Sequence, residues 1–212
     1  NDLKFQTFKT DSRKYWLLGK DYTLAIRGFF GKSIGANKQK FFLGGIPYLL
    51  GGGGETNGVT DEGHFRNVIL DTSNASLIHD IYFTEYAFPL RGARFAERFG
   101  TNATLLNMEV RFPFINYLAL GFPLKVIFGN IRGHAFMDVG AAWDDPEEFT
   151  NTSWPDRYGS SNSGEFSPWV TTIGLGTKIN LGYFLLRIET AWDKNPNGYS
   201  KAQWYFSLGP DW

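Results

Sequence analysis

Apolar and polar residues alternate with a period of two along the last third of the chain, which is the pattern of a β-strand whose two faces meet different surroundings. Within 203–212, one face carries Trp204, Phe206 and Leu208. The same parity continues to Trp212 at the end of the sequence. This pattern predicts a final strand with one apolar and one polar face.

The same alternation recurs upstream and indicates further strands. It is clear in four segments, which are 106–112, 133–143, 172–181 and 184–193. It is weaker in three others, which are 3–17, 22–30 and 39–45. Counted together with 203–212, these segments predict about eight strands, the smallest number from which a membrane barrel is built.

Two all-β architectures fit this pattern, a soluble β-sandwich and a transmembrane barrel. If the C-terminus is periplasmic, the connections expected on the outer side are 46–103, 144–168 and 194–202. Those expected on the inner side are 31–38, 113–124 and 181–183. The outer set is longer on balance, as outer-membrane barrels show. The preferred fold is therefore a transmembrane, antiparallel, up-and-down β-barrel with one long loop, 46–103, and the sandwich is the competitor.

Composition narrows the classes of function. The 21 Lys and Arg residues balance the 21 Asp and Glu residues, so there is no basic surface for nucleic acid. Cysteine is absent, which excludes disulfides and thiolate metal sites. No run approaches 18 consecutive apolar residues, which excludes a transmembrane helix. Barrel strands need no such run, because lipid-facing and lumen-facing residues alternate along them.

Patterns that would carry catalysis or bind a metal are weak. Asp138 and His134 share one strand face, but four residues of strand span about 13 Å, which is too far for a hydrogen-bonded pair. The three histidines have no ligand-like spacing, so neither a metal site nor a cofactor is predicted. A hydrolase is the weakest hypothesis, because nothing fixes the geometry of the four loop residues that it would use. They are Glu55, Asp61, Glu62 and His64.

Four segments carry a resemblance to a known family. In chain order they are FFLGG at 41–45, LRGARF at 90–95, NMEVRFPF at 107–114 and FMDVGAAWD at 136–144. The stretches GLGTKINLG, LLRIETAW and WYFSLG follow in the same order. This ordered set covers nearly the whole chain and resembles the C-terminal half of the BamA/TamA superfamily, the outer-membrane assembly and secretion barrels of the surface-antigen type.

The resemblance implies that the long loop folds back into the barrel lumen. Arg91 would then meet the lumen-facing acids, chiefly Asp138 and also Glu109. The planar guanidinium suits a bidentate pair with a carboxylate. Gly92 would allow a close backbone approach or a positive φ.

The chain departs from the family pattern in two respects. Ala93 stands where the family usually has an aromatic residue, and Phe95 is a candidate substitute. The family barrel has about twice as many strands and follows periplasmic POTRA domains, whereas residues 1–212 are expected to form a single barrel domain with no POTRA domain. An eight-stranded barrel is filled by its own side chains. Either the chain closes alone with the loop outside, or a second barrel half or a second copy completes a wider wall.

Aromatic residues predict the level of the membrane interfaces, where barrels carry aromatic girdles. Trp143, Trp192, Trp204 and Phe206 fit such girdles, and the alternative for each is a core position in a soluble fold. By resemblance, Trp212 fits the C-terminal aromatic that the assembly machinery reads.

The leading hypothesis is an integral barrel of the bacterial outer membrane that acts in protein assembly or transport without covalent chemistry, and so is not an enzyme. Its expected partners are the lipid bilayer and client outer-membrane proteins, with no nucleic acid and no cofactor. The alternative is a minimal structural or anchoring barrel without insertase activity.

Overall fold

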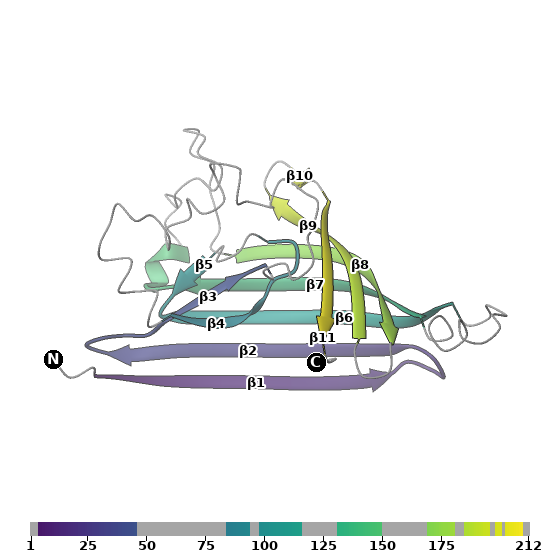
Figure 1. Cartoon of the computed structure of the whole chain (residues 1–212). Coiled ribbons are helices and arrows are strands. Elements are labelled where there is room, and N and C mark those ends of the chain that lie inside the picture. Colours follow the sequence, from purple (N-terminus) through teal and green to yellow (C-terminus); the bar gives the residue numbers. More distant parts are fainter. Residues whose placement is uncertain are drawn as a thin grey trace.

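The computed structural model describes residues 4–45, 84–93, 98–115, 131–149, 169–180, 185–195, 198–200 and 202–209. These residues form two β-sheets and one short 3-10 helix, Pro146–Phe149 (Figure 1). No helix within them is long and apolar enough to cross a membrane. The predicted all-β class is therefore confirmed.

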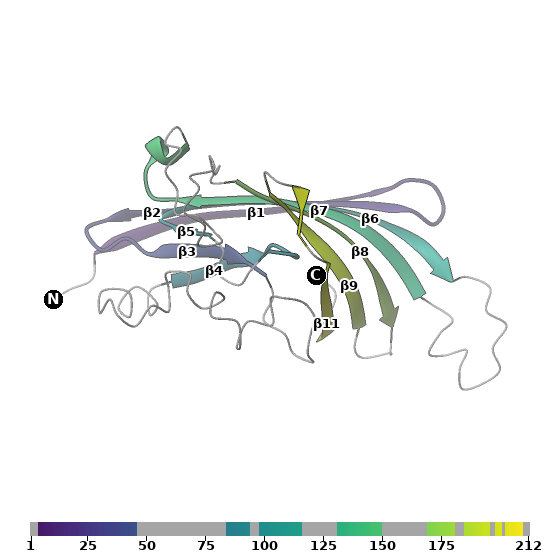
Figure 2. The ribbon, with the colours of Figure 1, turned by 90° about the horizontal axis from the view of Figure 1, so that it is seen from above.

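Seven strands of the larger sheet form an antiparallel wall. In sheet order they are β1 (Phe5–Leu17), β2 (Thr23–Gly35), β6 (Asn102–Ile115), β7 (Ile131–Trp143), β8 (Trp169–Asn180), β9 (Leu185–Asn195) and β11 (Gln203–Gly209). The two-residue strand β10 (Gly198–Tyr199) pairs with the same edge of β9 as β11 does. Figure 2 shows the wall bent into a trough, and within the described residues its edge strands β1 and β11 do not pair with each other.

The register of the wall aligns apolar residues on its convex face. One cross-strand row consists of Ile26, Met108, Met137, Ile173 and Trp192. Residues two positions away on each strand belong to the same face, since side chains alternate along a strand. An apolar surface therefore extends from β2 to β11.

The concave face is polar, yet many of its side chains are buried. One row on this face contains Asn107, Asp138 and Thr172, which are 4%, 0% and 0% exposed. Asp138 and Thr172 lie under the turn at 90–93, where Arg91 binds Asp138 and Gly92 lies against Thr172. The smaller sheet lies on the same side of the wall. Strand β3 (Lys40–Gly44) pairs in parallel with β4 (Thr84–Pro89) and antiparallel with β5 (Arg98–Gly100). Figure 2 shows this small sheet on the concave side of the trough.

Two expectations about the chain's path are corrected here. Segment 39–45 was expected in the wall, but it forms β3 of the small sheet, because Phe41 and Leu43 are fully buried against the concave face. Residues 31–35 were expected in an inner connection, but they continue β2. The end of the wall that was predicted to be the inner one is instead occupied by the turn between β1 and β2, at 18–22. The predicted connection 46–103 contains β4, β5 and the first two residues of β6.

An apolar core joins the small sheet to the wall. Its members are Phe29, Phe41, Leu43, Leu90, Ala93, Ala103, Leu105, Ala142 and Val170. Gly140 lies beneath them, and a Cβ there would come within 3.1 Å of the Leu90 Cδ1. Burying a large apolar side chain favours folding by roughly 1.5–3 kcal/mol. Phe41, Leu43 and Leu90 therefore hold the small sheet on the wall.

Candidate functional site

A tight turn after β4 carries the candidate site, and we call residues 90–93 the loop tip. The Leu90 amide donates to the Gly44 carbonyl at 2.7 Å, and the Ala93 amide donates to the Leu90 carbonyl at 3.2 Å. Gly92 has a φ of 92°, and a Cβ there would come 2.8 Å from the Ala191 Cβ. Only glycine combines that backbone conformation with so close an approach to β9.

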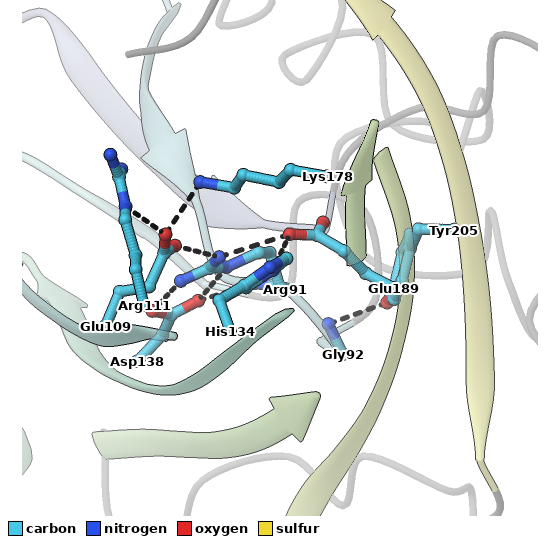
Figure 3. Close-up of polar contacts among 9 residues, drawn as sticks. All are labelled: Arg91, Gly92, Glu109, Arg111, His134, Asp138, Lys178, Glu189 and Tyr205. Atoms are coloured by element: carbon cyan, nitrogen blue, oxygen red, sulfur yellow. Dashed lines mark hydrogen bonds and ion pairs between the residues drawn. The ribbon is translucent and has the colours of Figure 1, made fainter. Parts of the chain in front are cut away.

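Arg91 points from the loop tip into the wall and is 4% exposed (Figure 3). Its Nε and Nη2 donate to the two carboxylate oxygens of Asp138, each at 2.9 Å. Its Nη1 donates to Glu109 Oε2 at 3.0 Å and to Glu189 Oε1 at 3.3 Å. The guanidinium also lies over the Phe136 ring, 3.6 Å from its centroid. This fork geometry is the strong, charge-assisted form of an arginine–carboxylate pair.

Two further cations complete the site. Lys178 Nζ and Arg111 Nε donate to Glu109 Oε1 at 2.6 and 2.7 Å. The three cations balance the three carboxylates when His134 is neutral. We call this set the charge cluster, and its members are Arg91, Glu109, Arg111, His134, Asp138, Lys178 and Glu189. Burial of a charge is costly unless it is paired. Separating the loop tip from the wall would therefore leave buried charges on both sides without partners.

Strand register brings the cluster together. His134 on β7 and Glu189 on β9 both stand opposite Gly176 of the intervening strand β8. Their side chains meet over that glycine, with Nε2 and Oε1 2.7 Å apart. A Cβ on Gly176 would come 2.6 Å from the His134 ring. A glycine in the middle strand thus permits contact between residues two strands apart.

The loop tip also touches the last strand of the wall. The Gly92 amide donates to the Tyr205 Oη at 2.6 Å, and that hydroxyl donates to Gln203 Oε1 at 2.8 Å. Tyr205 is 3% exposed and packs with Phe136 and Ala191.

A second ion pair joins the small sheet to the wall. Lys9 Nζ on β1 donates to both carboxylate oxygens of Glu85 on β4, at 2.8 and 2.9 Å. Lys9 is exposed and Glu85 is partly exposed. The distances match those of the Arg91–Asp138 pair, but this pair is in contact with solvent.

The structure brings the four residues expected at the loop-to-lumen contact, Arg91, Gly92, Asp138 and Glu109, into one place. Sequence reasoning missed Glu189 and Lys178. Alternation along 184–193 and 172–181 puts them on the polar faces of their strands, but it does not give their cross-strand neighbours. His134 does not pair with Asp138 in its own strand, and it contacts Glu189 instead.

The other candidate residues fall into two groups. Trp192, Trp204 and Phe206 lie on the convex face with the apolar rows, and Trp143 ends β7 on that same face. Their role in a membrane girdle remains a prediction. Phe95, Trp212 and the loop residues Glu55, Asp61, Glu62 and His64 lie outside the described residues. In the described part of the chain, no group of three or more His, Cys, Asp or Glu residues is placed to hold a metal ion.

Chemically, the cluster is an electrostatic clamp. Each carboxylate already accepts from a cation, and the guanidinium is held by three carboxylates at once.

Comparison with known proteins gives one family. A model described as the Omp85 superfamily domain matches residues 1–212. No curated protein matches the chain.

Proposed function

The chain belongs to the Omp85 superfamily, and from that premise we propose that it acts in protein assembly or transport as an integral barrel of the bacterial outer membrane. The membership confirms the resemblance drawn from the four sequence segments. The proposed action requires no covalent chemistry, because the site is a clamp rather than a reactive centre. Its partners in this proposal are the lipid bilayer and client outer-membrane proteins.

The observation that carries the proposal is the burial of Arg91 on the concave face. A loop that merely crossed the mouth of a pore would gain nothing from a buried arginine held by three carboxylates. Removing one partner from such a set leaves uncompensated charge, at a cost of about 3–5 kcal/mol. The clamp therefore fixes the loop inside the trough, where it supports the wall.

The convex face supports a membrane location, because its apolar row runs unbroken from Ile26 to Trp192. On β1 the same face is mixed, since Lys14, Ser12 and Thr10 lie between the exposed aromatic residues Trp16 and Phe8.

Strand direction indicates how the wall is completed beyond β1. Every pairing in the wall is antiparallel, so β1 and β11, the first and seventh positions, run the same way. Joining β1 to β11, within one chain or between two copies, would create parallel seams. Single-chain bacterial barrels are antiparallel with even strand numbers. We propose that an odd number of further strands, beginning beside β1, completes the wall.

The mass of the detergent-solubilised particle tests the proposed completion of the wall. Light scattering, with the detergent contribution subtracted, gives the protein mass of the closed, heat-modifiable barrel. We expect that mass to include polypeptide beyond residues 1–212. A closed particle built of one or of two 24.0 kDa copies alone would overturn the proposed completion.

A reconstitution assay tests the function. The intact protein is placed in phospholipid vesicles, and the folding rate of a urea-unfolded outer-membrane barrel is followed by its gel shift on heating. We expect faster client folding than in vesicles that hold an unrelated barrel, and a smaller acceleration with Arg91→Met. Equal rates in all three would refute the proposal and favour a structural or anchoring barrel.

A further inference from the structure

The last strand of the wall is held on one side. Strand β11 pairs with β9 over residues 203–209, and within the described residues no other strand covers its second edge. It is also shorter than β9, its partner. Unpaired backbone groups are costly in lipid, so whatever steadies β11 on β9 affects the whole edge of the wall.

Tyr205 connects this strand to the loop tip through its hydroxyl. The hydroxyl gives its proton to Gln203 Oε1 at 2.8 Å, which leaves oxygen lone pairs to accept from the Gly92 amide at 2.6 Å. Gln203 is itself 6% exposed, so this acceptor is held inside the structure. By accepting the hydroxyl proton, Gln203 orients the Tyr205 hydroxyl so that its lone pairs face the Gly92 amide.

The loop tip has little room to replace this contact. A Cβ at Gly92 would lie 2.8 Å from the Ala191 Cβ and 3.4 Å from both the Thr172 Cβ and the Trp192 amide nitrogen. Arg91, the preceding residue, is anchored on Asp138 at the same time. If β11 moved away from β9, the Gly92 amide would remain buried without an acceptor, which is the costly way to lose a hydrogen bond.

We propose that Tyr205 is a positioning residue that couples the charge cluster to the last strand. While Arg91 is seated on Asp138, the Gly92 amide holds the Tyr205 hydroxyl and so retains β11 on β9. When the tip is released, β11 loses that restraint. The relevance of this latch to client insertion rests on the proposed function, but the coupling itself is a property of the folded protein.

Amide hydrogen exchange on the intact protein in detergent tests the latch. Tyr205→Phe keeps the ring and removes the hydroxyl. We expect roughly tenfold faster exchange for the amides of residues 203–209 and of the loop tip, with β6 and β7 unchanged. Tyr199→Phe, a change at an exposed tyrosine next to β11, serves as the matched control and should leave every rate unchanged.

A double-mutant comparison separates coupling from simple packing. Arg91→Met should accelerate exchange in β11 when Tyr205 is present, and add little in the Tyr205→Phe background. Wild-type exchange in β11 of Tyr205→Phe, or equal acceleration by Arg91→Met in both backgrounds, would overturn the proposal.

Gln203→Leu provides a second test if Tyr205→Phe does not fold. It removes the acceptor that orients the hydroxyl, so exchange in β11 should rise although Tyr205 is intact, and unchanged exchange would overturn the proposal. These readouts need no client protein. A failed insertion assay together with a confirmed latch would therefore reject the proposed function alone, and the reverse result would reject the latch alone.

Discussion

Among the ion pairs that join the small sheet and its loop tip to the wall, a buried one and an exposed one are nearly equal in length. The Arg91–Asp138 contact measures 2.9 Å and the Lys9–Glu85 contact 2.8 Å. The side chains of the first pair are 5% and 0% exposed, whereas those of the second are 45% and 32% exposed. Distance therefore does not distinguish the two contacts, and burial does.

Burial determines where the stability of the molecule depends on a paired charge. Water screens the Lys9–Glu85 pair, and either ion can be hydrated if the other is lost. Around Arg91 the charges balance only as a set, and no water-exposed route remains for a carboxylate that loses its partner. We therefore expect the ion pair at β1 to contribute little to the stability of the fold, and the ion pairs of Arg91 with β6, β7 and β9 to contribute much.

Arg91→Met is expected to destabilise the protein more than any other variant considered. It leaves the carboxylates of Asp138, Glu109 and Glu189 short of one positive charge in a buried site. We expect the free energy of unfolding, measured by denaturant titration in detergent, to fall by about 3–5 kcal/mol. Arg13→Met is the matched control, since Arg13 pairs with Asp11 at an exposed position. Equal losses in the two variants would show that burial does not determine how much an ion pair contributes to the free energy of unfolding.

Gly92→Ala tests the close approach of the loop tip to the wall. The methyl group would meet the Ala191 Cβ, which adds about 1–3 kcal/mol of overpacking to the strain of a positive φ. Gly19→Ala is the control, because Gly19 has a φ of 96° with no atom within 4 Å of its built Cβ. Thermal unfolding should rank Gly92→Ala as clearly the less stable variant. A Gly19→Ala variant of equal instability would mean that backbone strain alone matters.

Lys9→Gln has the smallest expected effect. The exposed pair with Glu85 should contribute about 0–1 kcal/mol, and less in high salt. The same denaturant titration, run at low and high salt, checks both statements. A loss as large as that of Arg91→Met would break the contrast between the two contacts.

Strand faces were predictable from the sequence because side chains alternate strictly. Leu106 and Met108 define the apolar side of β6, which by itself puts Glu109 on the other side, and the same reasoning places Asp138. Register was not predictable, since alternation fixes a face but not the neighbour across the sheet. For that reason Glu189 and Lys178 were assigned to the polar face without being assigned to the cluster.

Segment 39–45 shows a second limit. Phe41 and Leu43 alternate as lipid-facing residues would, but they are buried between the small sheet and the concave face of the wall. A period of two reports that one side of a strand is apolar, and lipid and protein core satisfy it equally well. The Arg91 contact itself followed from resemblance rather than from the alternation, which offered two acids but not the arginine.

Thiol labelling can show whether the loop tip is seated inside the trough, because the chain has no cysteine. Ala93→Cys, at 3% exposure, is compared with Ala36→Cys, at an exposed position in the turn after β2, in the folded protein with a hydrophilic maleimide. We expect rapid labelling at 36, protection at 93, and loss of that protection when Arg91→Met is added. Equal labelling of the two thiols in the otherwise unchanged protein would show that the loop tip is not seated inside the trough.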